Sequence, residues 1–149
     1  MTRKIKSVAV IGGGTMGAGI AGKCADAGCR VLLLEINEDA AAKAMERITG
    51  GRAPIIDDPE SARLIETGTF DQIDRIAGYD WICEAIIEDL QTKRDFFEKL
   101  ESARSDGSVI STNTSGIPLR SIVDGMPERL RRDVVVTHFF KPVKVMKLL

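Results

Sequence analysis

Residues 8–17 read VAVIGGGTMG and decide the fold of this chain. The four apolar residues predict a buried strand, and Gly12, Gly14 and Gly17 follow it in the G-x-G-x-x-G register. In this register the first glycine permits a tight turn, the second lets the backbone approach a pyrophosphate, and the third brings the next helix close to the strand. The first N–H groups of that helix attract phosphate oxygens. We therefore expect a phosphate-binding turn, with Thr15 and Met16 beside the phosphates in the first helical turn.

The sequence that follows the glycines strengthens this interpretation. Residues 15–27 predict a helix that ends at Gly28, and residues 30–35 contain an apolar run typical of a parallel strand covered on both faces. Glu35 ends this strand, 18 residues after Gly17. A carboxylate about 20 residues beyond the glycines accepts hydrogen bonds from the adenosine ribose and repels a 2′-phosphate. Glu35 thus predicts NAD rather than NADP, the alternative being a glycine turn without a ligand and an acid that only ends a strand.

Composition and charge are those of one soluble domain. The 149 residues carry a formal net charge of −1, so no general basic field favours nucleic acid or an anionic membrane. No apolar run approaches the ~20 residues of a membrane span, and we find no signal peptide. Cys24, Cys29 and Cys83 lack metal-binding spacing, and His138 is the only histidine, which argues against a zinc site. We expect reduced thiols and a cytoplasmic location, with no nucleic-acid or membrane partner.

The rest of the chain alternates between strands and helices. Asn37 is a typical helix N-cap, with two acidic residues in the first turn and a stop at Gly50. Repeated β-α-β units predict an α/β fold, a Rossmann-type doubly wound and mainly parallel sheet with helices on both faces. We expect strands at 6–11, 30–35, 65–70, 81–87, 108–112 and 133–140. We expect helices at 15–27, 38–49, 59–64, 71–77, 88–103 and 118–123, all within one domain of residues 1–149.

Residues 88–103 predict the clearest amphipathic helix of the chain. Its apolar side chains gather on one side: Leu90, Phe96, Phe97 and Leu100. Asp89 and Lys93 are spaced to form an i,i+4 pair on another face. Trp81, in the preceding strand, is expected in the core together with the two phenylalanines.

Polar residues follow three of the expected strands. In open α/β sheets, ligands lie beyond the carboxyl ends of the strands, which is the edge that also carries the glycine loop. We therefore expect five polar side chains to converge on one bound cofactor: Glu88, Lys93, Asn113, Ser115 and His138.

With these segments together, the chain resembles the NAD-binding domain of the 3-hydroxyacyl-CoA dehydrogenases of fatty-acid β-oxidation. The resemblance runs from residue 5 to residue 149 and is carried by 12–22, 84–88 with Lys93, 111–115, 138–142 and 146–148. It implies NAD as the cofactor and an acyl-CoA as the substrate. It further implies that Glu88 and Lys93 line the cofactor site, that Ser115 contacts nicotinamide and substrate, and that His138 is the catalytic base.

The reaction that the resemblance implies explains these residue types. Oxidation of a secondary alcohol removes the hydroxyl proton while hydride leaves the same carbon for the nicotinamide. A histidine, with a reference pKa of ~6.5, accepts such a proton near neutrality. A hydrogen bond from Ser115 or Asn113 would hold the substrate oxygen and align the carbon.

The chain departs from the family pattern in several places. Asparagine usually follows His-Phe-Phe, where this chain has Lys141, a residue that could bind a phosphate or a thioester carbonyl, or reach solvent. Residues 37–64 hold one ordinary helix and a short one, where the family has a long helical pair that helps to clamp the acyl-CoA. The family pattern also places a glutamate that orients the histidine directly after position 149, and then a helical domain for substrate and dimer contacts. From its apolar end we expect a fragment of a longer, homo-oligomeric enzyme, inactive alone.

Structural roles remain open for each of these residues. His138 could be a packed or capping histidine, and Ser115 the N-cap of the helix at 118–123. Glu88 could only favour a helix start, and Lys93 could only pair with Asp89. The arginines at 129, 131 and 132 are expected in a solvated loop, with phosphate recognition as the alternative. For the whole chain, the alternative function is a non-catalytic NAD-binding module that senses redox state or has a structural role.

Overall fold

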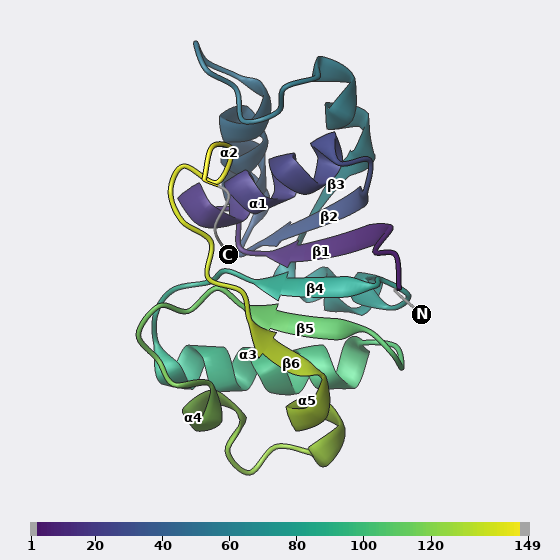
Figure 1. Cartoon of the computed structure of the whole chain (residues 1–149), viewed down its shortest axis with the longest axis vertical. Coiled ribbons are helices and arrows are strands. Elements are labelled where there is room, and N and C mark those ends of the chain that lie inside the picture. The colour runs from purple at the N-terminus through teal and green to yellow at the C-terminus, as the bar shows by residue number, and fades with distance from the viewer. Residues whose placement is uncertain (1–2, 147–149) are drawn as a thin grey trace.

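The structure is a computed structural model that describes residues 3–146 (Figure 1). Its strands are β1 (Ser7–Ile11), β2 (Arg30–Glu35), β3 (Ile65–Thr69), β4 (Trp81–Glu84), β5 (Val109–Thr112) and β6 (Val134–Val136). Its α-helices are α1 (Thr15–Asp26), α2 (Glu38–Thr49), α3 (Leu90–Ala103), α4 (Leu119–Val123) and α5 (Glu128–Asp133). Two 3₁₀ helices complete the elements, η1 (Pro59–Leu64) and η2 (Phe70–Ile76).

The strands form one sheet in the order β3-β2-β1-β4-β5-β6, and every pair is parallel. The chain therefore winds outward from β1 to one edge, returns to the centre at β4 and winds to the other edge. This is the Rossmann order, and it confirms the doubly wound α/β fold. The switch between β1 and β4 places the carboxyl ends of these strands beside the glycine loop.

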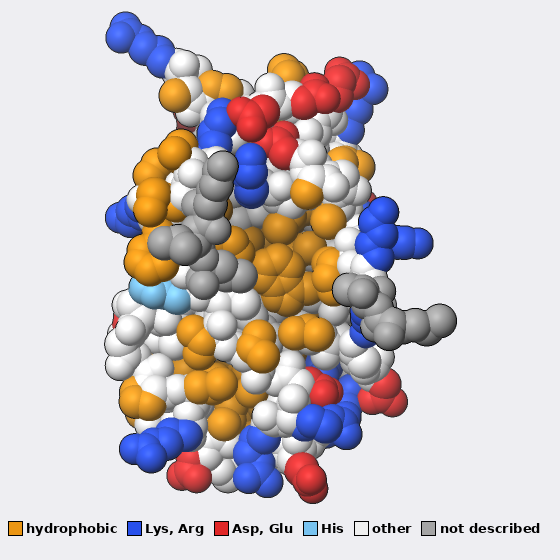
Figure 2. Space-filling model, viewed as in Figure 1, with side chains coloured by type: hydrophobic (Ala, Val, Ile, Leu, Met, Phe, Trp, Pro, Cys, Tyr) orange, Lys and Arg blue, Asp and Glu red, His pale blue; other side chains and the backbone are white. Residues whose placement is uncertain are grey.

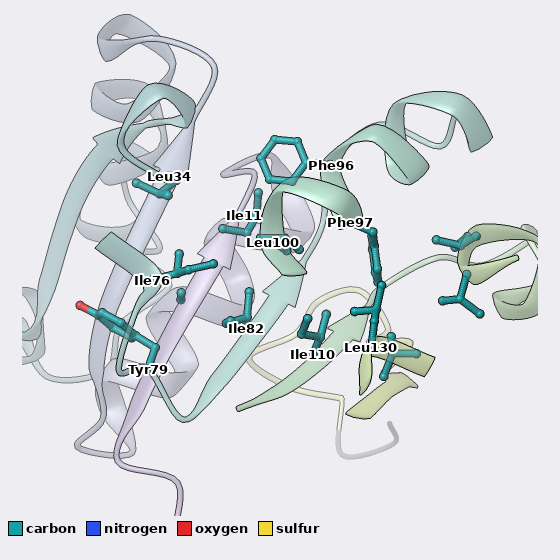
Figure 3. Packing of buried hydrophobic residues seen from close by; sticks show 14 of the residues in the cluster. Ile11, Leu34, Ile76, Tyr79, Ile82, Phe96, Phe97, Leu100, Ile110 and Leu130 are labelled. Carbon is teal, nitrogen blue, oxygen red and sulfur yellow. The ribbon is translucent and has the colours of Figure 1, made fainter. Parts of the chain in front are cut away.

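The two faces of the sheet bury different residues because side chains alternate along a strand. Val8 and Val10 of β1 pack with apolar side chains of α1, α2 and residues 55–56 on one face. Ala9 and Ile11 pack on the other face, where Phe97 and Leu100 of α3 cover the sheet (Figure 3). Side chains on both faces of β1 and β2 are therefore buried, which explains the uninterrupted apolar runs in these two strands.

Several local predictions are confirmed. The Asn37 side chain accepts a hydrogen bond from the N–H of Ala40 at 2.9 Å, which caps α2. Gly28 follows α1 with a φ of +83°, the left-handed conformation that ends many helices at glycine. Phe96 and Phe97 are buried as predicted, whereas Trp81 is only half-buried and lies on the other face of the sheet, against the cluster that contains Val8. Between β2 and β3 the structure has one ordinary helix and η1, as the sequence indicated.

The predicted length of two strands is wrong. The last strand ends at Val136 rather than Phe140, because its partner strand β5 ends at Thr112. The N–H of Thr137 donates to the carbonyl oxygen of Thr112, and this is the last hydrogen bond between the two strands. The strand predicted at 81–87 ends at Glu84, whose carboxylate turns the chain by accepting the N–H of Ile86 at 2.7 Å. The other limits differ by one or two residues, as at α3, which begins after its N-cap Asp89.

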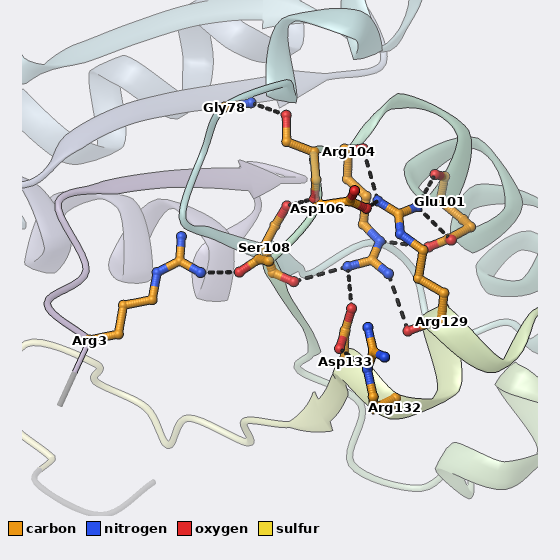
Figure 4. A network of polar contacts seen from close by, with 11 residues as sticks. Arg3, Gly78, Glu101, Arg104, Asp106, Ser108, Arg129, Arg132 and Asp133 are labelled. Carbon is orange, nitrogen blue, oxygen red and sulfur yellow. Dashed lines mark hydrogen bonds and ion pairs between the residues drawn. The ribbon is translucent and has the colours of Figure 1, made fainter. Parts of the chain in front are cut away.

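The arginines at 129, 131 and 132 belong to the helix α5 rather than to a loop, although Arg131 and Arg132 are solvent-exposed as expected; Figure 4 shows the network around Arg129 and Arg132. Arg104 is buried and pairs with Glu101 at 2.6 Å and with Asp133 at 2.9 Å. Arg129 also pairs with Glu101, at 2.7 Å. These pairs tie α5 to the carboxyl end of α3, near the amino ends of the strands. They occupy Arg129 with structural partners, so phosphate recognition by this cluster finds no support.

The structure also bears on membrane spans, metal sites and cysteines. Within residues 3–146, no helix is long and apolar enough to cross a membrane, and no three His, Cys, Asp or Glu side chains are grouped to hold a metal ion. Cys24, Cys29 and Cys83 are free thiols. The prediction made from the end of the chain, residues 143–149, and the resemblance at 146–148 fall in part on residues 147–149, which lie outside the described residues.

Candidate active site

The three glycines of the motif have different physical roles. A Cβ on Gly17 would lie 1.7 Å from the carbonyl oxygen of Gly12, so glycine there allows α1 to pack on the turn. Gly12 has a φ of +95°, and a Cβ on it would meet the carbonyl oxygen of Ala85 at 2.7 Å. A Cβ on Gly14 would have no neighbour within 4 Å, so the space over Gly14 is open to a ligand. Thr15 and Met16 follow in the first turn of α1, where N–H groups are free to bind phosphate oxygens.

Glu35 lies beside this loop at the end of β2. One carboxylate oxygen accepts the N–H of Gly13 at 2.6 Å and the other accepts the N–H of Ile36 at 2.8 Å. The carboxylate is thereby held half-exposed at the loop, with lone pairs left for a hydroxyl donor. Arg47 of α2, which the sequence analysis did not single out, donates to the carbonyl of Gly13 at 3.1 Å. The open glycine, the helix N-terminus and this carboxylate fit the pyrophosphate and ribose of NAD.

A buried ion pair lies under the loop that follows β4. The Lys93 ammonium is 2.7 Å from a carboxylate oxygen of Glu84, and both side chains are inaccessible to solvent. The other oxygen of Glu84 accepts the hydroxyl of Thr112 at 2.6 Å. The predicted pair of Lys93 with Asp89 is wrong, because Asp89 caps α3 through the N–H of Thr92 and Lys93 reaches inward to the sheet. Sequence reasoning assigned no role to Glu84, although an acid in an otherwise apolar strand was a usable signal.

Glu88 connects this ion pair to the segment after β5. One of its carboxylate oxygens lies 3.6 Å from the Lys93 ammonium. The other accepts the Thr114 hydroxyl and the N–H groups of Ser115 and Gly116, the last two at 3.2 Å. Burial acts to raise the pKa of Glu88, but these hydrogen bonds and the lysine outweigh it and lower the pKa below its usual value. Glu88 is thus a fixed, ionised carboxylate that holds the backbone at Ser115, and it precedes α3 rather than beginning it.

Asn113 connects the end of β5 to the segment that carries His138. Its side-chain oxygen accepts the N–H of Phe139 at 2.9 Å, which leaves the amide NH₂ as a donor. Thr137, on the other side of the histidine, donates from its N–H to Thr112 at 3.0 Å. The backbone of His138 is therefore held on both sides by β5 and the residue after it. The imidazole is half-buried, 5.0 Å from the ring of Phe140.

A cavity of about 350 Å³ brings together Met16 and four of the five polar residues that were expected to converge, all but Lys93. It is lined by Met16, Ala85, Ile86, Glu88, Asn113, Ser115, His138, Phe139, Phe140 and Lys141. Lys93 does not line it, because this lysine lies beneath Glu88. Figure 2 shows the histidine of the chain, in pale blue, at the surface beside apolar side chains.

The structure decides one of the open alternatives, the one at Ser115. Ser115 is not the N-cap of α4, since Pro118 holds that position, and its hydroxyl is left at the cavity. His138 lies in the same cavity as a hydroxyl and an amide, between apolar walls. This set can accept a proton and donate hydrogen bonds to one small oxygen-bearing group.

Comparisons with known protein families and with individual relatives agree on one family. The family model of the 3-hydroxyacyl-CoA dehydrogenase NAD-binding domain matches residues 7–149. A probable 3-hydroxyacyl-CoA dehydrogenase of Deinococcus radiodurans is 42% identical over 154 residues, covering 98% of this chain and 44% of the relative. A probable 3-hydroxybutyryl-CoA dehydrogenase of Bacillus subtilis is 33% identical, covering 97% of this chain and 52% of the relative. The chain thus spans about half the length of these relatives.

Solved structures agree. A crystal structure of 3-hydroxybutyryl-CoA dehydrogenase from Escherichia coli matches with a TM-score of 0.82 and 32% identity, over 97% of this chain and 32% of that one. A crystal structure of Mycobacterium tuberculosis FadB2 matches with a TM-score of 0.85 and 27% identity, over 97% of this chain and 52% of that one.

Proposed function

The chain belongs to the 3-hydroxyacyl-CoA dehydrogenase family, as its NAD-binding domain, and from this premise we propose that it oxidises 3-hydroxyacyl-CoA to 3-oxoacyl-CoA. NAD, when bound, supplies the hydride acceptor of this reaction. The observation that supports the proposal most directly is the shared cavity. It joins Met16 of the glycine-loop helix to Ser115, Asn113 and His138, so a dinucleotide on the loop reaches a base and two hydrogen-bond donors.

We assign three roles at the reacting end. His138 accepts the proton of the substrate hydroxyl at an imidazole nitrogen, a step with which the half-buried, surface-facing ring is compatible. Ser115 donates its hydroxyl to the substrate oxygen, from a backbone that Glu88 holds in place. Asn113 donates from its NH₂ group, since its oxygen is occupied by Phe139. Glu88 and Lys93 support these groups rather than taking or giving protons.

At the other end, we propose that Glu35 binds the adenosine ribose and sets the preference for NAD. Its carboxylate is held in place by two backbone N–H groups, so it cannot turn away from an incoming 2′-phosphate without losing both bonds. Gly12 and Gly17 shape the turn, and Gly14, Thr15 and Met16 receive the pyrophosphate.

We further propose that residues 1–149 act with a second, helical domain in a homo-oligomeric enzyme. The greater length of the relatives supports this part of the proposal. A cytoplasmic location is favoured by the three free thiols. Phe140 and Lys141 are exposed residues of the cavity lining, and we propose that the acyl-CoA enters beside them.

The test is a titration followed by turnover. The complete polypeptide is titrated with NADH and NADPH and then assayed with acetoacetyl-CoA in the reducing direction. We expect tighter binding of NADH and acetoacetyl-CoA-dependent oxidation of NADH. Binding of NADH with no turnover of any 3-oxoacyl-CoA would contradict the enzyme and favour the non-catalytic module.

A further inference from the structure

The segment after β6 crosses the molecule and is attached at its far end. We call residues 137–144 the strap; in Figure 1 it is the yellow chain that runs from β6 back towards α1. Its first part is bonded to β5 and Asn113, as described for His138. Phe139 then stacks on Trp81, with 6.3 Å between ring centroids and 27° between planes. Phe140 and Lys141, which follow, form a wall of the active-site cavity.

The strap is attached to α1 at a notch formed by a glycine. Val143 is 8% exposed and belongs to the core cluster of α1 and the sheet. A Cβ on Gly19 would lie 2.9 Å from both the Cβ and a methyl carbon of Val143. Glycine inside a helix costs about 1 kcal/mol relative to alanine, so its use here needs a reason. The close approach of Val143 is a sufficient one.

A second contact fixes the register of the strap. The Lys144 ammonium is 2.7 Å from the Asp57 carboxylate and 3.1 Å from the carbonyl oxygen of Pro54. The loop that carries Asp57 is itself held, since the N–H of Asp57 donates to Asp26 of α1 at 2.9 Å. The hydrogen bond from Lys144 is the main cause that lowers the pKa of Asp57 below its usual value. The pair is solvent-exposed, so we assign it the alignment of the strap and assign the attachment to buried Val143.

We propose that Gly19 and Val143 are a positioning pair for the reaction, which hold the strap so that Phe140 and Lys141 form a wall of the cavity that Glu88 also lines. This inference rests on the proposed function. Neither residue lines the cavity. They act through the strap, because only one residue separates Lys141 from Val143. A rigid wall at this place keeps the acyl group in reacting geometry, and a displacement of about 1 Å in such a group can lower the rate by a hundredfold.

Trp81 makes the attachment measurable without any assay of activity. It is the only tryptophan of the 149 residues, and Phe139 of the strap covers it. In Gly19→Ala we expect a red-shifted Trp81 emission and stronger quenching by acrylamide, measured on residues 1–149. NADH affinity is expected to stay within about threefold, since Gly14 and Glu35 lie outside the strap. In the complete polypeptide we expect a ten- to hundredfold loss of kcat/KM.

The matched variant is the exchange Gly19→Ala with Val143→Gly. It removes the Cβ at 143 that the new methyl group would meet, but it also removes the buried Val143 side chain, so the emission and only a part of the lost log kcat/KM should return. Lys144→Met and Asp57→Asn change groups at the surface and test the second contact; Asp57 also lies 3.6 Å from the Lys23 ammonium, so Lys144→Met is the more specific of the two. Each should raise KM about two- to fivefold, and the double variant should do no more than either single one.

The outcomes separate this inference from the proposed function. Two results would overturn the proposed contact of Gly19 with Val143. One is an unchanged Trp81 emission in Gly19→Ala, and the other is an exchange variant whose emission and kcat/KM do not differ from those of Gly19→Ala. A shifted emission with kcat/KM within twofold of the original protein overturns the positioning role alone. If the original protein shows no turnover, the proposed function fails and the inference fails with it.

Discussion

The two halves of the candidate site are assembled from the chain in opposite ways. The glycine-loop half comes from one continuous stretch, residues 12–35, as a turn, a helix and a strand. The His138 half comes from three separate stretches, residues 84–93, 111–116 and 137–143. In the first half, backbone N–H groups form most of the site, and the absence of side chains at the glycines leaves room for the ligand. In the second, side chains hold one another across strands, as Glu88 holds the backbone at Ser115.

The two halves should therefore respond differently to substitutions. At Gly12 and Gly17, a methyl group added to the glycine has a local effect, because the nearest neighbours are backbone atoms that cannot move aside. Around His138, the loss of one partner leaves another buried polar group without its hydrogen bond or counter-charge. A substitution in one of these three segments should therefore also disturb the position of the segments bonded to it.

The largest effect is expected from His138→Gln. Proton removal occurs only along the reaction path, so kcat of the complete polypeptide should fall by about 10²–10⁴ while the NADH dissociation constant stays within twofold. Steady-state kinetics and NADH fluorescence titration measure the two quantities. Retention of half of the activity would show that His138 is not the base. It would also show that the His138 half of the site is not the part that carries out the chemical step.

The second prediction concerns the buried pair beneath Glu88. Lys93→Met leaves the Glu84 carboxylate buried without its counter-charge, and the free energy of unfolding should fall by about 3–5 kcal/mol. In the double variant with Glu84→Gln, an amide can still accept from Ile86 and donate to the Thr112 oxygen. Urea unfolding should then recover most of the loss. A double variant as unstable as the single one would mean that the charge pair is not what joins these segments.

The third prediction sets two glycines of the same motif against each other. Gly17→Ala places a methyl group on the Gly12 carbonyl and should cost about 1–3 kcal/mol of stability or more. Gly14→Ala meets no neighbour and should leave stability within about 0.5 kcal/mol, yet weaken NADH binding, because the methyl group occupies the space left for the pyrophosphate. Thermal unfolding and NADH titration on the same samples decide. Equal losses of stability in both variants would contradict the division of roles.

The smallest effect is expected at Glu35. Glu35→Gln keeps an acceptor for the Gly13 N–H but removes the charge that repels a 2′-phosphate. The preference for NADH over NADPH should narrow by about tenfold, equivalent to ~1.4 kcal/mol, as measured by calorimetry. Asp39→Asn, also on the α2 side of the loop, serves as the control and should leave the ratio unchanged. An original protein that binds NADPH as well as NADH would remove the basis for this assignment.

Sequence alone was sufficient where the determinants are local. The spacing of Gly12, Gly14 and Gly17, the N-cap at Asn37 and the stop at Gly28 all describe short stretches whose conformation depends on their own residues. The apolar runs then required a sheet covered on both faces. Because the carboxyl ends of parallel strands meet at one edge, the shared position of Asn113, Ser115 and His138 also followed.

Sequence reasoning failed where a residue's partner is distant in the chain. The run after Asp133 has strong strand character, yet β6 ends at Val136 because β5 has ended. The spacing of Asp89 and Lys93 indicated a surface pair, yet Lys93 is buried with Glu84 from β4. Helical periodicity describes which side chains are neighbours on one helix, but not which acid another element places beneath it.

The class of fold, the glycine loop with Glu35 and the family of this chain could thus be predicted from the amino-acid sequence. Three features required the folded structure: the buried pair of Glu84 and Lys93, the hydrogen bonds from the backbone at Ser115 to Glu88, and the packing of the strap on Gly19. The two groups differ in the range of the interactions that produce them. Backbone conformation is set within a few residues, whereas burial and ion pairing depend on which segments the folded sheet brings into contact.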